Sequence, residues 1–68
     1  MELVQRLRTI RKLRRLSQAD VAEILETTQQ VYSRYENGTN EIPVRHIVTL
    51  CKFYDISADW LLGLKDEL

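Results

Sequence analysis

The chain has 68 residues, 44% of them hydrophobic, which is enough for one small core, so we expect a single domain over residues 1–68. No apolar run approaches the roughly 18 residues of a membrane-spanning helix, and we expect no membrane partner. The net charge is zero, but residues 1–35 carry seven basic and four acidic side chains, and residues 36–68 carry three basic and six acidic ones. The first half is therefore suited to a polyanionic partner such as nucleic acid.

The first predicted helix covers roughly residues 2–14 and is amphipathic. Its apolar side chains recur at helical spacing and form one stripe, made of Leu3, Leu7, Ile10 and Leu13. The adjacent face is basic and consists of Arg8, Arg11, Lys12 and Arg15. A basic amphipathic start leaves an organellar presequence and a membrane-surface peptide as alternative interpretations. A secretion signal is disfavoured because no uncharged apolar segment follows the basic residues.

Two short helices with a tight turn between them follow the basic helix. Ser17 is a typical N-cap, and Asp20 three residues later completes a capping box, so the second helix begins here and runs to about residue 25. Glu26-Thr27 forms the turn, and Thr28 caps the third helix. Gly38 provides a left-handed stop at its end.

The third helix has two chemically different faces. Its apolar face, with Val31, Tyr32 and Tyr35, is expected to anchor it to the domain. Glutamine pairs with adenine and arginine with guanine in the major groove, which is where the second helix of a helix-turn-helix lies. We therefore predict that the opposite, polar face contacts DNA bases. The predicted base-reading residues are Gln29, Gln30, Ser33 and Arg34.

Two further helices complete an expected all-α fold. Pro43 suits the first position of a fourth helix, whose apolar residues are expected to face the core. Those residues are Val44, Ile47, Leu50, Cys51 and Tyr54. Ser57 caps a short fifth helix that ends near Gly63, and we expect its Leu61 to close the core. The remaining apolar residues here exceed what a small core can bury, and we predict a homodimer contact at Trp60, Leu62 and Leu64.

Catalytic and metal-binding patterns are lacking. Cys51 is the only cysteine, and His46 has no partner at the spacing of metal ligands. A cytoplasmic, reducing compartment fits this composition. Without paired carboxylates, a Cys–His pair or a glycine-rich phosphate loop, we expect no enzyme, no cofactor, no metal and no small-molecule ligand.

The segment from Ser17 to Gly38 resembles the Cro and Xre-like phage-repressor helix-turn-helix family. The similarity continues through Ile42-Pro43 and residues 56–63, so it covers nearly the whole chain. It implies a five-helix, lambda-repressor-like domain that binds double-stranded DNA and regulates transcription. A homodimeric repressor of a pseudo-palindromic operator is the favoured function. An antitoxin-like module of the same fold, with another protein as its partner, is the alternative.

The resemblance also assigns roles to individual residues. It implies that Gln18 bonds a DNA phosphate near the start of the second helix. It further implies an ion pair between Arg11 and Glu36 that joins the first helix to the third. Neutral donors around the third helix complete the predicted phosphate contacts. The full set is Gln18, Thr28, Asn37, Thr39 and Asn40.

Three features depart from the family pattern. Glu26 stands in the turn where Gly or Asn is common, so a left-handed backbone there would cost about 1 kcal/mol. Arg15 replaces a frequent glycine between the first two helices. Thr39-Asn40-Glu41 follows Gly38 where the family often has Lys or Arg. We therefore expect backbone N–H groups and neutral side chains of this loop to contact phosphates, and binding to depend less on salt.

Overall fold

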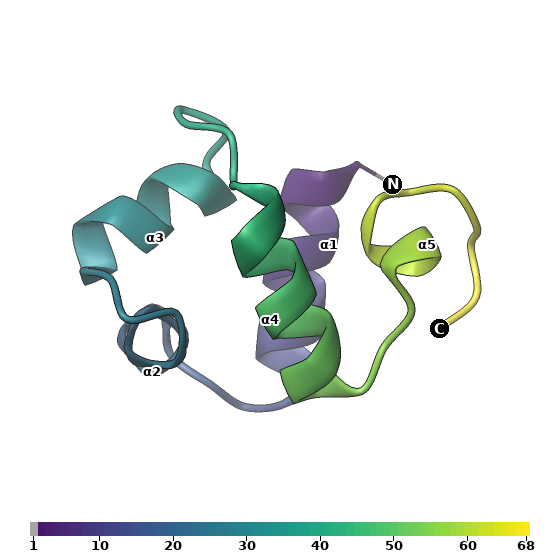
Figure 1. Ribbon diagram of the computed structural model, residues 1–68, viewed down its shortest axis with the longest axis horizontal. Coiled ribbons are helices and arrows are strands. Elements are labelled where there is room, and N and C mark those ends of the chain that lie inside the picture. The colour runs from purple at the N-terminus through teal and green to yellow at the C-terminus, as the bar shows by residue number, and fades with distance from the viewer. Residues whose placement is uncertain (1) are drawn as a thin grey trace.

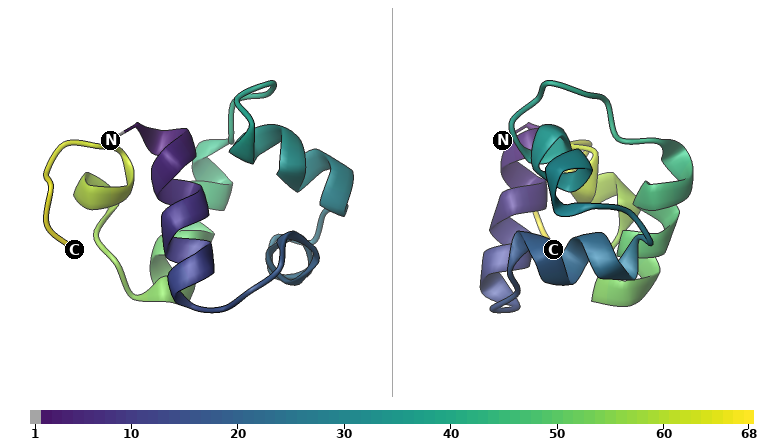
Figure 2. Two further views of the ribbon diagram at one scale, coloured as in Figure 1. Left: turned by 180° about the vertical axis from the view of Figure 1, so that it is seen from behind. Right: turned by 90° about the vertical axis from the view of Figure 1, so that its left-hand side faces the viewer.

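The computed structural model describes residues 2–68, and this part of the chain contains five helices and no strand (Figure 1). They are α1 (Leu3–Leu13), α2 (Gln18–Ile24), α3 (Gln29–Glu36), α4 (Val44–Tyr54) and α5 (Ala58–Leu61). α1 and α4 lie between the α2–α3 pair on one side and α5 on the other (Figures 1 and 2). The all-α prediction is confirmed. None of the helices over residues 2–68 is both long and apolar enough to cross a membrane.

Side-chain caps fix where the short helices begin. The Ser17 hydroxyl accepts a hydrogen bond from the Asp20 amide at 3.0 Å, and the Asp20 carboxylate accepts one from the Ser17 amide at 2.8 Å. This is the predicted capping box at the start of α2. Thr28 caps α3 and Ser57 caps α5 in the same way, each accepting from an amide three residues ahead.

The start of α4 differs from the prediction by one residue. Pro43 was expected to be the first residue of this helix, but its ψ of 152° is extended, and it is the N-cap instead. The helix begins at Val44. Proline suits the N-cap as well as the first helical position. Its fixed φ leads into the helix, and the backbone N–H that proline lacks is not needed at either position.

All five helices and the loop before α4 contribute to one hydrophobic core. Its buried members are Leu7, Ile10, Val21, Ala22, Leu25, Tyr32, Tyr35, Ile42, Ile47, Leu50, Tyr54, Trp60 and Leu61. Leu61 is fully buried, as predicted for the residue that closes the core. Two residues assigned to the core by periodicity are exposed instead, Leu13 by 60% and Val44 by 74%. Leu13 is the last residue of α1 and Val44 the first residue of α4. At these helix ends, the apolar face has no neighbouring element to cover it.

Trp60 also belongs to this core. Only 4% of its surface is exposed, whereas Leu62 and Leu64 are exposed by 44% and 74%. A side chain that is buried within one copy of the chain is not available to a second copy. The predicted dimer contact is therefore reduced to Leu62 and Leu64.

A buried arginine attaches the C-terminal segment to α1. The Nη1 group of Arg6 donates to the carbonyl oxygens of Trp60 and Lys65, both at 2.7 Å. Its guanidinium lies 5.1 Å from the centre of the Trp60 ring, and its Nη2 is 3.3 Å from a carboxylate oxygen of Asp66. These contacts compensate for the burial of a charge on a side chain that is only 2% exposed.

Candidate nucleic-acid interface

The turn between α2 and α3 is tight because one residue adopts a left-handed backbone. Glu26 has φ of 57°, as predicted for a residue in the place of a glycine. Arg15, in the loop between α1 and α2, has a similar φ of 58°. The Thr27 amide donates to the carbonyl oxygen of Ala22 at 2.9 Å and closes the end of α2. Ala22 is 2% exposed, so its small side chain lies beneath the turn in the core.

The two faces of α3 separate as the sequence pattern predicts. Tyr32 and Tyr35 are buried at 0% and 8% exposure and anchor the helix. Of the predicted base-reading residues, Ser33 is half-buried, and Gln29, Gln30 and Arg34 are exposed. They line a shallow hollow together with one residue from the start of α2. Its lining residues are Gln18, Gln29, Gln30, Ser33, Arg34 and Asn37.

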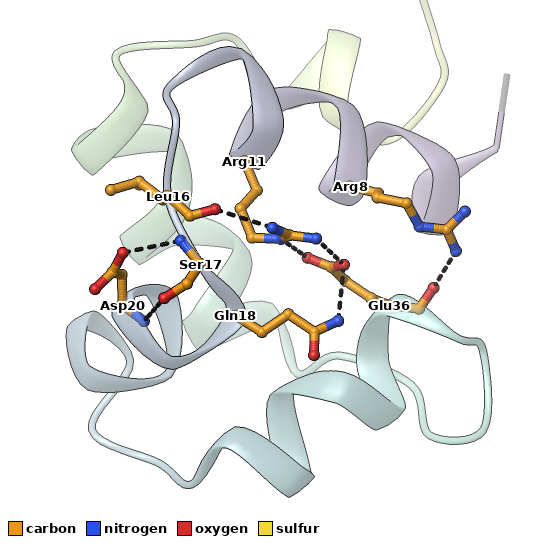
Figure 3. A network of polar contacts seen from close by, with 7 residues as sticks. All are labelled: Arg8, Arg11, Leu16, Ser17, Gln18, Asp20 and Glu36. Atoms are coloured by element: carbon orange, nitrogen blue, oxygen red, sulfur yellow. Dashed lines mark hydrogen bonds and ion pairs between the residues drawn. The ribbon is translucent and has the colours of Figure 1, made fainter.

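A buried carboxylate links the three N-terminal helices (Figure 3). Glu36, at the end of α3, is 2% exposed. Its Oε2 accepts from Arg11 Nε at 2.6 Å, and its Oε1 accepts from Arg11 Nη2 at 3.0 Å. Gln18 Nε2 donates to the same Oε1 at 3.2 Å. The guanidinium of Arg11 also donates to the carbonyl oxygen of Leu16 at 2.9 Å, so one side chain holds α1, α3 and the loop before α2.

The charges in this network stabilise each other. Burial by itself would raise the pKa of Glu36. The Arg11 guanidinium, followed by the Tyr32 hydroxyl and the Gln18 amide, outweighs burial and lowers that pKa below its usual value. The hydrogen bond to Glu36 raises the pKa of Arg11, so both partners stay ionised. Burial, reinforced by the neighbouring Glu36 carboxylate, raises the pKa of Tyr32 far above normal. Tyr32 therefore remains neutral on the buried face of α3.

The loop after α3 differs from what we expected. The amides of Gly38 and Asn40 donate to carbonyl oxygens of α3 at 3.4 and 3.2 Å. The amide of Thr39 donates to Asn37 Oδ1 at 3.0 Å, and the Thr39 hydroxyl donates to the same oxygen at 2.6 Å. The expectation that these backbone N–H groups are available for phosphates is wrong, because the loop already uses them to close α3. The exposed side-chain amide groups of Asn37 and Asn40 are donors that this segment still offers.

Comparisons with known proteins agree with this architecture. A helix-turn-helix family model matches residues 7–61. The chain belongs to the Cro and Xre-like helix-turn-helix family. Members of this family are DNA-binding transcriptional regulators and not enzymes, as the sequence predicts.

One relative in sequence and one protein of the same fold are both longer than the chain. An uncharacterized HTH-type transcriptional regulator of Bacillus subtilis (strain 168), YobD, is 36% identical over 63 residues, which are 93% of this chain and 56% of that protein. The crystal structure of a transcriptional regulator from Listeria innocua has the same fold, with a TM-score of 0.87 at 21% identity. The match covers 98% of this chain and 63% of that one. The chain thus spans somewhat more than half the length of both proteins.

The strained turn of this helix-turn-helix gives a stability prediction. We expect Glu26→Gly to be more stable than Glu26→Ala by about 1 kcal/mol, because only glycine adopts the left-handed backbone without a steric cost. Urea denaturation of both variants measures the difference, and alanine is the matched control because it also removes the Glu26 carboxylate. Equal midpoints for the two variants would show that this backbone carries no strain.

Proposed function

We propose that the chain is a sequence-specific repressor that inserts α3 into the major groove of a pseudo-palindromic operator. The observation that carries this proposal is the polar face of α3. Its side chains are directed outward by the buried Tyr32 and Tyr35, and they share one hollow with Gln18 of α2. Both amide and guanidinium groups read base edges by paired hydrogen bonds. We assign base reading to Gln29, Gln30, Ser33 and Arg34.

Phosphate contacts are proposed for neutral donors on both sides of α3. Gln18 is oriented by its bond to Glu36 and lies in the first turn of α2, where the helix N-terminus also favours an anion. The Thr28 hydroxyl accepts from the backbone, which leaves its own hydrogen for a phosphate. Asn37 and Asn40 contribute amide groups. Thr39 supports them indirectly, because its hydroxyl already donates to Asn37.

Homodimerisation supplies the affinity that one small domain lacks. A single domain of this size makes few base contacts, and two copies on inverted half-sites double them. The exposed Leu62 and Leu64, next to α5, are the proposed contact between copies. In the cytoplasm, a dimer bound to an operator that overlaps a promoter would repress transcription by excluding RNA polymerase.

Selection of binding sites from random duplex DNA tests the proposed function. We expect enrichment of two inverted half-sites about 34 Å apart, or one helical turn. Each half-site should contain an adenine and a guanine, or their complements, within about four base pairs. No enriched sequence would contradict sequence-specific binding. A single unrepeated half-site would contradict the dimer alone.

A further inference from the structure

We propose that Arg8 of α1 is the cation that binds a DNA phosphate at the carboxyl end of α3. This inference rests on the proposed function, because it requires α3 to lie in the major groove. It adds a charged contact from a helix outside the helix-turn-helix. It also accounts for how this chain binds DNA without a basic residue in the loop after α3.

The position of Arg8 is defined by one hydrogen bond. Its Nη2 donates to the backbone carbonyl oxygen of Glu36 at 3.0 Å, and Figure 3 shows the guanidinium reaching from α1 to this end of α3. Arg8 is exposed, and within residues 2–68 its remaining N–H groups have no protein acceptor. Arginine carries five donors in a planar fork, so one bond to the protein leaves others for a phosphate.

Several negative charges and dipoles near this end of α3 disfavour the approach of a phosphate. Carbonyl groups at a helix C-terminus carry a partial negative charge, and the nearby loop adds Glu41. Arg11 cannot offset these, because its guanidinium is already bound to the Glu36 carboxylate and to Leu16. The loop itself contributes only neutral side chains and the acidic Glu41 between Asn37 and Ile42. Arg34, in the last turn of α3, is assigned to a base under the proposed function. Arg8 is then the cation that remains for a phosphate approaching this end of α3.

The length of α3 brings this end close to the DNA backbone. With eight residues it is about 12 Å long, close to the roughly 12 Å width of the major groove. The N-terminal residues of a recognition helix contact the bases, so its carboxyl end lies toward a phosphate strand. Arg8 and the side-chain amide of Asn37, the residue after Glu36, are then placed to hold the same phosphate.

The test is the salt dependence of binding to a random-sequence duplex, measured for the parent, Arg8→Gln, Arg8→Lys and Lys52→Gln. One phosphate contact contributes about 0.9 to the slope of log affinity against log salt. Between 50 and 200 mM salt, the parent should therefore lose about 3.5-fold more affinity than Arg8→Gln. Arg8→Lys keeps the charge and should retain the parent slope. Lys52→Gln makes the same change in net charge on α4, away from α3, and should also retain it.

The outcomes separate this inference from the proposed function. A parent that binds no duplex would contradict both. If the parent binds and Arg8→Gln and Arg8→Lys have equal slopes, the charge of Arg8 does not contact a phosphate and the inference fails. Thermal melting of each variant accompanies the titrations. An affinity loss in Arg8→Gln that follows a lower melting temperature, with an unchanged slope, would show a purely structural role and likewise overturn it.

Discussion

Glu36→Gln is expected to lower the free energy of unfolding by about 3–5 kcal/mol, the usual cost of removing one partner from a buried ion pair. The cost is large because Arg11 would remain nearly buried, with 12% of its side chain exposed and no carboxylate to neutralise it. Stable proteins of ordinary size have only about 5–15 kcal/mol in total, so the variant should be close to unfolding. Urea denaturation followed by circular dichroism measures the loss.

Glu23→Gln is the matched control, since Glu23 is an exposed acid on α2. It should change stability by less than about 0.5 kcal/mol. Parent-like stability of Glu36→Gln would contradict the energetic role of the pair. It would also imply that Arg11 finds another compensating partner when the carboxylate is removed.

The pH dependence of the same variant has a definite sign. The pKa of Glu36 is lower in the folded protein than in the unfolded chain, whose usual value is 4.5. The ionised carboxylate therefore contributes its full stabilisation above pH 4.5 and loses it as the pH falls through the folded pKa. The stability difference between parent and Glu36→Gln should be constant near neutral pH and narrow in acid.

The ion pair between Arg11 and Glu36 connects stability with the geometry of the proposed DNA interface. Glu36 is bound from α1 by Arg11, from α2 by Gln18, and through its backbone carbonyl by Arg8. Three helices are thus joined at the carboxyl end of α3. A shift of Glu36 would move the proposed base-reading face and the proposed phosphate contacts together. We infer that the network keeps α3 in register with the rest of the interface.

Local sequence signals predict much of this fold, because they act over a few residues. Ser17, Thr28 and Ser57 begin helices through contacts three residues away, and these were predictable from residue type alone. The left-handed Glu26 was predicted only from the family resemblance. Arg15, noted only as the replacement of a frequent glycine, is left-handed as well. A third left-handed residue, Asp55 with φ of 55°, ends α4, and we did not predict it. Aspartate is among the residues that tolerate this conformation, which is a weak signal.

Contacts between distant segments were not predictable from periodicity. Arg6 is separated from its partner Trp60 by 54 positions, and its charge suggests an exposed residue. Its burial depends on where the C-terminal segment crosses α1, which no local pattern encodes. The loop amides were misjudged for a related reason. The path of the chain after Gly38 decides whether the backbone amides of Thr39 and Asn40 donate to the protein or point to solvent. Their residue types do not decide it.

Arg34→Ala is expected to weaken operator binding by about 1–3 kcal/mol, with relaxed preference at one base pair only. The side chain lies in the last turn of α3, is exposed, and lines the same hollow as Gln29 and Gln30. Because the side chain is exposed, its guanidinium donors are accessible to guanine O6 and N7. The measurement is affinity for the selected operator and for each single-base variant of it.

Arg34→Lys is the matched control that separates a base contact from a phosphate contact. Lysine keeps the charge but loses the planar fork that pairs with guanine through two parallel bonds. If Arg34 reads a base, the lysine variant should also lose discrimination at that base pair. If Arg34 binds a phosphate, lysine should restore nearly all of the affinity, and alanine should weaken every sequence equally with a shallower salt slope. The second pattern would remove Arg34 from the residues that determine specificity and leave that role to Gln29, Gln30 and Ser33.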